Sequence, residues 1–316
     1  MPLMPADLAI RIGRLRLANP VLTASGCFGY GLEAWSVFDV SRLGALVMKT
    51  LTARPRLGNP PPRIAETPAG MLNAIGLENP GMEAFLRDIL PKSRELGCPV
   101  LVASVAGKDL AEYATLTAAL QVKGISAVEL NLSCPNLNSG GIDFGGDAAF
   151  VREATRRCLK ASPKRDLWVK LTPHTADIRV TARAAWEAGA AAVTVANTYV
   201  GMSIDWKRGV PRTGHGTGGL SGPAIRPLTV ALVAKVAADC EVPIVASGGI
   251  SSPQDAMEYA WAGASAVQVG TASFRDPAAC LRILEGIPDC LKQAKATRWR
   301  NVVGRLKRPQ TGKEIL

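Results

Sequence analysis

Paired cysteines, aromatic residues and long apolar runs are all scarce in this sequence of 316 residues. Its seven cysteines are scattered and none stands in a C-x-x-C pair, which argues against a disulfide framework, a zinc site or an iron–sulfur cluster held by this chain alone. No apolar run reaches the roughly 18 residues of a membrane span. Because the first residues lack the charged and apolar regions of a signal peptide, we expect a cytoplasmic protein that does not enter a membrane.

The sequence also lacks the motifs of two common kinds of site. No G-x-G-x-x-G stands between a strand and a helix, which argues against a Rossmann-type dinucleotide site. The two histidines, His174 and His215, are far apart and too few for a metal site, so we expect no bound metal. Glycine, by contrast, is frequent, and short glycine turns let the backbone approach a ligand closely.

Positive charge is concentrated at one end of the chain. The net charge is +11, and residues 291–316 hold eight Lys and Arg against one acid. A basic tail can contact nucleic acid, but this one lacks interleaved aromatic residues and any recognised binding motif. We therefore expect a solvated C-terminal helix with a frayed end, and no nucleic-acid partner.

Short apolar runs alternate with amphipathic stretches along the chain. The runs predict eight strands near 20–24, 44–49, 99–104, 126–131, 167–171, 191–196, 243–247 and 265–270. The amphipathic stretches predict helices near 82–97, 108–123, 147–161, 175–188, 224–239 and 253–262. Strands that are apolar on both faces and are each followed by a helix are typical of a parallel sheet covered by helices. Eight such units predict an α/β fold, a (β/α)8 TIM barrel, with residues 1–316 as a single domain.

Three other segments complete the predicted barrel. The segment 8–18 alternates around Gly13 and predicts a small N-terminal hairpin that closes the base. The connections 50–80 and 197–222 are too long for simple turns, and we expect long loops at the C-terminal face. Within the second connection, the glycine-rich stretch 214–219 predicts a mobile loop over the mouth of the barrel.

Polar residues follow the predicted strands where each strand ends. Lys49-Thr50, Asn131, Lys170 and Asn197-Thr198 all come from different strands. Because the carboxyl ends of barrel strands meet at one mouth, these side chains should converge there. Two lysines and several amides suit a planar, anionic ligand that accepts and donates hydrogen bonds.

Two glycine turns follow the last two strands. Gly248-Gly249 and Gly270-Thr271 occupy the positions at which barrels usually bind phosphate through backbone N–H groups. Ordinary turn chemistry also explains a glycine pair, but two such turns in consecutive units favour a cofactor that carries phosphate.

A cysteine and a run of loop residues are further candidates. Cys134, in the stretch Asn-Leu-Ser-Cys-Pro-Asn, is read equally well from its position as a buried thiol or as a thiolate base activated by nearby lysines. The segment Asn73 to Leu77 lies in the first long connection, where turn formation alone would explain its asparagine.

Several collinear stretches resemble class 1B dihydroorotate dehydrogenase. They include residues 24–31, 58–81 (GNPPPRIAETPAGMLNAIGLENPG), 131–136 (NLSCPN), 197–205 (NTYVGMSID), 218–227 (GGLSGPAIRP) and 267–274 (VQVGTASF). The resemblance implies a flavin mononucleotide (FMN) barrel that oxidises dihydroorotate to orotate in pyrimidine (UMP) biosynthesis. It makes Cys134 the base that takes a proton from substrate carbon 5, while carbon 6 delivers hydride to FMN.

The resemblance also assigns binding residues. It implies substrate contacts from Lys49, Asn73, Ala74, Ile75, Gly76, Leu77, Asn131, Asn197 and Thr198. It implies FMN contacts from Ser25, Lys49, Thr50, Ser104, Asn131, Lys170, Gly222, Gly248, Gly249, Gly270 and Thr271. Two positions depart from the family pattern, because Ser104 and His174 each stand where asparagine is usual.

Partners follow from the resemblance alone. Class 1B members pair with an electron-transfer subunit that carries FAD and a [2Fe–2S] cluster and passes electrons to NAD. The resemblance therefore implies a homodimeric core within a heterotetramer. The pyrimidine-reducing domain of dihydropyrimidine dehydrogenase shares the barrel, FMN and an N-x-S-C-P-N loop and is the alternative. A class 1A enzyme that reduces fumarate is a second rival.

Overall fold

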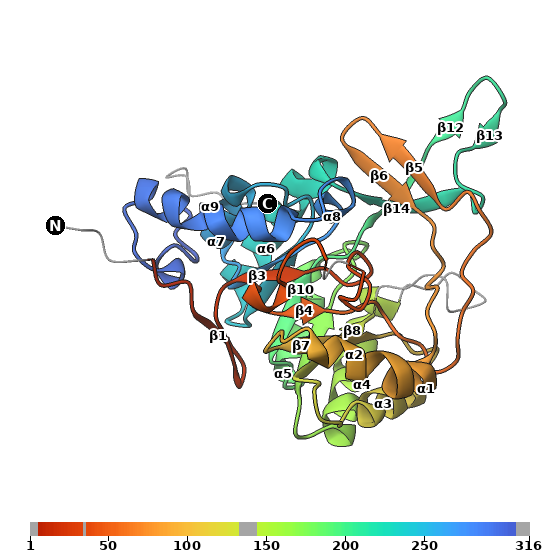
Figure 1. Cartoon of the computed structure of the whole chain (residues 1–316), viewed down its shortest axis with the longest axis horizontal. Coiled ribbons are helices and arrows are strands. Elements are labelled where there is room, and N and C mark those ends of the chain that lie inside the picture. The colour runs from red at the N-terminus through yellow and green to blue at the C-terminus, as the bar shows by residue number, and fades with distance from the viewer. Residues whose placement is uncertain (1–5, 34–35, 133–143, 308–316) are drawn as a thin grey trace.

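Eight parallel strands form the central sheet of the computed structural model, which describes residues 6–33, 36–132 and 144–307 (Figure 1). In the order of the sheet they are β3 (Val21–Thr23), β16 (Ala266–Val269), β15 (Ile244–Ser247), β10 (Ala192–Val195), β9 (Asp166–Lys170), β8 (Ala127–Asn131), β7 (Leu101–Val105) and β4 (Leu46–Val47). A bridge between Leu22 and Ala45 brings β3 to β4, so the sheet curls into a barrel. The predicted barrel and all eight of its strands are confirmed.

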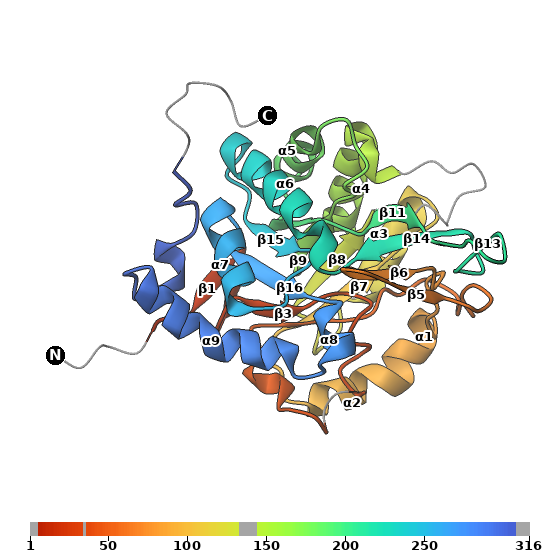
Figure 2. The same ribbon diagram turned by 90° about the horizontal axis from the view of Figure 1, so that it is seen from above.

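Helices cover the outside of the barrel (Figure 2). They are α1 (Met82–Ala84), η2 (Phe85–Ile89), α2 (Leu90–Glu95), α3 (Leu110–Ala119), α4 (Ala148–Ala161), α5 (Ile178–Glu187), α6 (Arg226–Asp239), α7 (Pro253–Ala262), α8 (Ala272–Arg275) and α9 (Ala279–Gln293). Short 3-10 turns are η1 (Val40–Arg42), η3 (Phe144–Gly146), η4 (Pro223–Ile225) and η5 (Trp299–Asn301). Several helices begin at an acceptor side chain; Asp109, for example, accepts the backbone N–H of Glu112 at 2.8 Å. Among the described residues, no helix is long and apolar enough to cross a membrane.

The barrel interior changes from apolar to polar toward the ends of the strands. Alternate residues of each strand point inward, so each strand contributes to successive layers. Residues such as Ala127 and Trp168 form an apolar cluster at the base. Two residues further along β8, Glu129 accepts hydrogen bonds from Thr194 at 2.8 Å and Gln268 at 2.7 Å. Polar side chains are therefore collected toward the mouth.

The N-terminal hairpin closes the base of the barrel, as predicted. It consists of β1 (Ile10–Ile12) and β2 (Leu15–Leu17). Ile12 and Leu17 are fully buried and belong to the same apolar cluster as the barrel interior. Gly13 has φ +55°, and a Cβ there would lie 2.5 Å from a carboxylate oxygen of Asp166, which explains a glycine at the turn.

The two long connections after β4 and β10 combine into a second sheet. Its antiparallel strands, in order, are β11 (Tyr199–Met202), β14 (Thr217–Ser221), β6 (Gly70–Asn73) and β5 (Ile64–Thr67). The small hairpin β12 (Ile204–Asp205) and β13 (Val210–Pro211) projects beside it, on the side of the molecule away from β1 (Figure 1). The prediction of a mobile loop at 214–219 was wrong for Thr217, Gly218 and Gly219, because β14 begins at Thr217 and pairs with β11 at all three positions.

The basic tail is only partly solvated. Basic side chains such as Lys292 and Arg300 are exposed, as expected. Trp299 and Val302, however, are fully buried, and the Trp299 indole N–H donates to the Ser265 carbonyl at 2.9 Å. The prediction of a solvated tail was therefore wrong for this part, and residues 308–316 lie outside the described residues.

Candidate active site at the mouth of the barrel

A chain of hydrogen bonds joins polar side chains at the ends of β4, β7, β8 and β10. The Thr50 hydroxyl lies 2.9 Å from that of Ser104 and accepts from the Asn131 amide at 3.4 Å. The Asn197 amide donates to Asn131 at 3.1 Å, and its oxygen accepts the backbone N–H of Thr198 at 2.8 Å. Five of the predicted site residues therefore lie together, at the carboxyl ends of their strands.

Two lysines add positive charge to this mouth. Lys170 is buried at 5% exposure, and its ammonium donates to the Ser25 hydroxyl at 3.2 Å. Lys49 is half-buried. Neither forms an ion pair with a described residue. Burial raises the pKa of the nearby Cys27 thiol to about 11, although Lys170 and Lys49 both act to lower it. The two ammonium groups thus face one region and favour an anion there.

The segment 73–77 is fixed by residues that precede it in the chain. Asn59 donates from its side chain to the carbonyl at position 74 and from its backbone to that at position 75, both at 3.0 Å. Arg56 donates to the carbonyl at position 76 at 3.3 Å. The Asn73 amide donates to the Gly219 carbonyl at 3.2 Å. The segment is therefore rigidly placed against β14.

Glycines from two loops meet on the other side of the mouth. A Cβ on Gly249 would lie 2.7 Å from the Gly222 carbonyl oxygen, and both residues have positive φ, +68° and +95°. Gly248 has φ +153°, and a Cβ there would lie 2.8 Å from the Thr229 hydroxyl. Only glycine allows such close approach of backbone segments, and turns of this kind leave N–H groups free to bind an anion.

Strand β14 joins the two groups. Within β14, Gly219 lies so close to Thr198 that no side chain would fit at position 219. Thr198 belongs to the group of hydrogen-bonded amides and hydroxyls described above. Two residues beyond Gly219, the Ser221 hydroxyl accepts from Thr271 at 2.8 Å, on the glycine side. Gly270 belongs to the same region, since a Cβ there would lie 3.1 Å from the Cys27 sulfur. β14 therefore links the part of the mouth around Thr198 to the part around Thr271.

The predicted base lies outside the described residues. Cys134 falls in the range 133–143, which follows the buried Leu132. Among the residues that the structure does describe, there is no cluster of three or more His, Cys, Asp or Glu side chains that could hold a metal ion.

Sequence reasoning missed three supporting residues. Asn59 stands in the stretch 58–81 that carries the family resemblance, but no role was assigned to it, and Arg56 carried no signal beyond the composition of its loop. His174 was considered as a metal ligand, which was rejected, and as a departure from a family pattern, but not as a residue that supports the site. Its Nε2 accepts the backbone N–H of Val200 at 2.9 Å, and its ring meets that of Tyr199 edge-on at 6.0 Å. His174 thereby positions the strand that follows Asn197 and Thr198.

Comparisons with known proteins agree on one family. A family model described as "Dihydroorotate dehydrogenase" matches residues 7–291. A protein of Geobacillus kaustophilus is 45% identical over 285 residues, which cover 90% of both chains. One of Pelobacter propionicus is 44% identical over 304 residues, covering 96% of this chain and 99% of the relative. One of Desulforudis audaxviator is 46% identical over 291 residues, covering 92% and 94%. All three relatives are named "Dihydroorotate dehydrogenase B (NAD(+)), catalytic subunit".

Proposed function

Since the chain belongs to the dihydroorotate dehydrogenase family, we propose that it oxidises dihydroorotate to orotate in pyrimidine biosynthesis, with electrons passed on to NAD. The observation that carries this proposal is the mouth of the barrel, where Lys49 and Lys170 stand beside a chain of amides and hydroxyls. Dihydroorotate is a small cyclic carboxylate with amide edges. A cationic region lined by paired donors and acceptors is complementary to such a molecule.

The residues at the mouth also fit an FMN cofactor. Gly222, Gly248, Gly249, Gly270 and Thr271 would hold its phosphate through backbone N–H groups, because the close packing of these turns leaves a concave backbone surface. Further contacts to FMN would come from Ser25, Lys49, Thr50, Ser104, Asn131 and Lys170. The positive charge of Lys170 would favour negative charge on the ring. When bound, FMN accepts the hydride that leaves carbon 6 of the substrate.

The substrate would lie between the amides and the fixed segment 73–77. Lys49 would bind its carboxylate, while Asn73, Asn131, Asn197 and Thr198 would hold the edges of the pyrimidine ring. Because Asn59 and Arg56 hold the carbonyls of the segment, its side chains would need little reorganisation on binding.

Cys134 would act as the base. Its thiolate would take the proton from carbon 5 while a hydride leaves carbon 6, so that a double bond forms between these two carbons. The thiol would then return its proton to water. A thiolate placed near two ammonium groups is more readily formed at neutral pH than an ordinary thiol.

The further path of the electrons needs a second protein. We propose a partner subunit with FAD and a [2Fe–2S] cluster and a heterotetramer built on a homodimer of this chain, since its relatives are named catalytic subunits of an NAD-linked enzyme. A single barrel domain in the cytoplasm stays our expectation from the sequence.

The proposed reaction is tested on the purified protein under anaerobic conditions. We expect an absorption spectrum of oxidised flavin that dihydroorotate bleaches with one equivalent per site. Dihydrouracil tests the alternative, a dihydropyrimidine dehydrogenase-type barrel, which would bleach faster with that substrate. A protein that holds no flavin, or whose flavin dihydroorotate leaves oxidised, would contradict the proposal.

The role of Cys134 is tested by Cys134→Ala. Removal of a general base costs on the order of a hundredfold to ten-thousandfold in rate, so we expect bleaching to slow by about that factor with flavin content unchanged. Cys240→Ala, which removes a thiol at the end of α6, is the matched control and should bleach at the normal rate. Equal rates in both variants would exclude the thiol as the base.

A further inference from the structure

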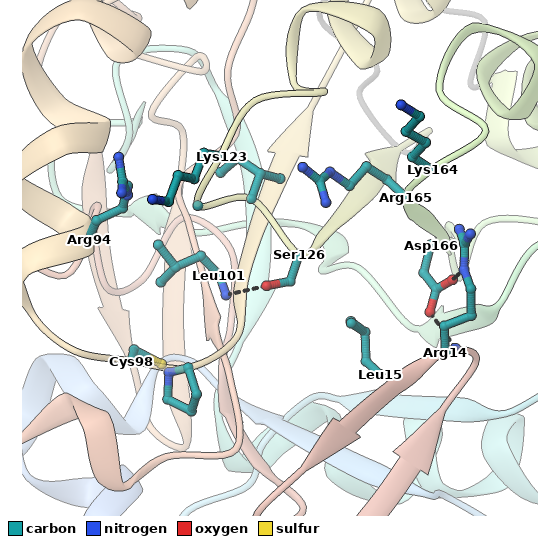
Figure 3. A pocket seen from close by; sticks show the side chains of 13 residues that line it. Arg14, Leu15, Arg94, Cys98, Leu101, Lys123, Ser126, Lys164, Arg165 and Asp166 are labelled. Atoms are coloured by element: carbon teal, nitrogen blue, oxygen red, sulfur yellow. Dashed lines mark hydrogen bonds and ion pairs between the residues drawn. The ribbon is translucent and has the colours of Figure 1, made fainter.

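A hollow of about 530 Å³ lies at the end of the barrel opposite the mouth. It is formed by the turns that lead into β7, β8 and β9 and by the tip of the β1–β2 hairpin (Figure 3). Its floor includes Leu15, Leu101 and Ser126. Nothing in the proposed reaction uses this end of the molecule.

Cationic side chains dominate the lining. They are Arg14, Arg94, Lys123, Lys164 and Arg165, against the single carboxylate of Asp166. Arg94 and Lys123 lie on one side of the hollow, and Arg14, Lys164 and Arg165 on the other (Figure 3). Like charges gathered around one space repel one another, and an anion in that space relieves the repulsion.

The one carboxylate is already engaged. Asp166 accepts both the backbone N–H and the side-chain Nε of Arg14, each at 2.7 Å. It is buried at 6% exposure and ties the hairpin to the start of β9. Of the other four cations, none forms an ion pair with a described residue. The positive charge of the hollow is therefore not neutralised by the described part of the chain.

Arg165 has an unused donor. One terminal nitrogen donates to the Val122 carbonyl at 2.9 Å, but the Nε nitrogen is buried and has no described partner. A buried N–H without an acceptor costs roughly 1–3 kcal/mol, so a turn of the guanidinium group that brings Nε to an anion in the hollow would be favoured. Ser126 accepts the Leu101 N–H at 3.4 Å, which leaves its hydroxyl hydrogen to donate.

Helix ends explain part of this charge. The carboxyl ends of α2 and α4 lie near the hollow, and their carbonyl groups attract cations such as Arg94 in the last turn of α2. That attraction does not account for Lys123, which follows α3 by several residues, or for the unpaired Nε of Arg165.

We propose that this hollow binds a small polyphosphate anion, either free pyrophosphate or the phosphate chain of a nucleoside triphosphate. Guanidinium groups match the oxygen pairs of phosphate, and three arginines line the hollow. Its volume falls within the roughly 300–1,000 Å³ of small-molecule pockets and exceeds what a single phosphate needs. The proposal is independent of the reaction at the mouth, because the two sites lie at opposite ends of the barrel.

Calorimetric titration of the FMN-loaded protein with inorganic pyrophosphate tests the proposal. The bound FMN fills the phosphate site at the mouth, so pyrophosphate reports on other sites. We expect saturable binding of one equivalent that weakens with added salt. The double variant Arg94→Gln with Lys123→Gln should weaken it by about tenfold or more. The control double variant, Lys292→Gln with Arg300→Gln, removes one lysine and one arginine from exposed positions in the tail. It should change the affinity for pyrophosphate by less than about twofold.

A second titration with ATP separates the two sources of phosphate. Binding of ATP that competes with pyrophosphate and is much tighter identifies a nucleotide; equal affinity identifies the phosphate chain alone, and both outcomes support the site. Absence of saturable pyrophosphate binding, or equal weakening by the two double variants, overturns the proposal. Both double variants change exposed side chains, and a thermal melt checks that each is folded.

Discussion

At the scale of single residues, buried thiols make the fold less stable at alkaline pH. Cys158, on α4, is fully buried, and burial raises the pKa of its thiol from 9.0 to about 11, more than the Thr117 hydrogen bond lowers it. The folded protein therefore holds this proton more tightly than the unfolded chain does. The part of the free energy of unfolding that comes from this protonated thiol is fully present below pH 9.0 and is lost as the pH rises through about 11.

We expect Cys158→Ala to reduce that alkaline loss. Two units of pKa correspond to about 2–3 kcal/mol, so the free energy of unfolding should fall less steeply above neutral pH in the variant. Urea unfolding at neutral and alkaline pH measures it. Val151→Ala, a truncation of a buried neighbour on the same helix, should lower stability equally at both pH values. Parallel pH profiles for the wild type and Cys158→Ala would contradict this prediction.

A second residue-scale prediction concerns Gly249. Alanine there would place a Cβ 2.7 Å from the Gly222 carbonyl and push apart the turns that we assign to the FMN phosphate. We expect Gly249→Ala to lose about tenfold or more in FMN affinity, measured by flavin fluorescence on dilution. Gly216→Ala is the matched control, because Gly216 also has positive φ (+89°) but no atom within 4 Å of its Cβ position. If both variants retain FMN equally, the glycine turns do not hold the cofactor.

At the scale of elements, the polar layer inside the barrel ties three strands together. Glu129 on β8 accepts from Thr194 on β10 and Gln268 on β16, and all three are fully or almost fully buried. Removing the carboxylate leaves two buried donors without an acceptor, at roughly 1–3 kcal/mol each. We expect Glu129→Ala to lower the free energy of unfolding by about 3 kcal/mol or more, measured by urea unfolding.

A surface carboxylate is the matched control for that variant. Glu187 pairs with Arg152 at 3.0 Å with half of its side chain exposed. Glu187→Ala should cost less than about 1 kcal/mol. Comparable losses in the two glutamate variants would show that the internal layer does not stabilise the barrel.

The barrel strands were predictable because each is a short apolar run bounded by turns. β8, for example, was expected at 126–131 and spans Ala127–Asn131. The sheet at the mouth was not predictable. Its strands β6 and β14 are short and are separated by more than a hundred residues. The two buried residues of β6, Met71 and Leu72, are adjacent, and β14 has no fully buried residue, so neither strand has a clear alternation of apolar and polar residues.

The convergence of the site was predictable for a similar reason. Asn131 and Lys170 are the last residues of their strands and Asn197 follows another, and barrel topology alone brings strand ends together. Their partners were not predictable. Which side chain donates to which depends on packing, and the contacts of His174 and Asn59 join segments whose spacing along the chain carries no pattern.

At the scale of the whole molecule, a dinucleotide motif is absent from the sequence, although the relatives are named as NAD-linked. We expect the isolated chain to oxidise dihydroorotate with an artificial dye as acceptor but not with NAD. Adding the electron-transfer subunit should restore NADH formation, followed by absorbance. Rapid NAD reduction by the isolated chain would show that no second subunit is needed; rapid use of fumarate would favour the class 1A alternative.

Two residues of β14 that are only two positions apart contact different parts of the mouth. Gly219 accepts a hydrogen bond from Asn73 in the proposed substrate segment, and Ser221 accepts one from Thr271 in the turns assigned to the FMN phosphate. Protein engineers who wish to alter which acid is accepted will thus find cofactor retention changing alongside it whenever they mutate this strand. Libraries directed at new specificity should diversify Asn197 and the neighbouring rim instead, and leave residues 217–222 intact.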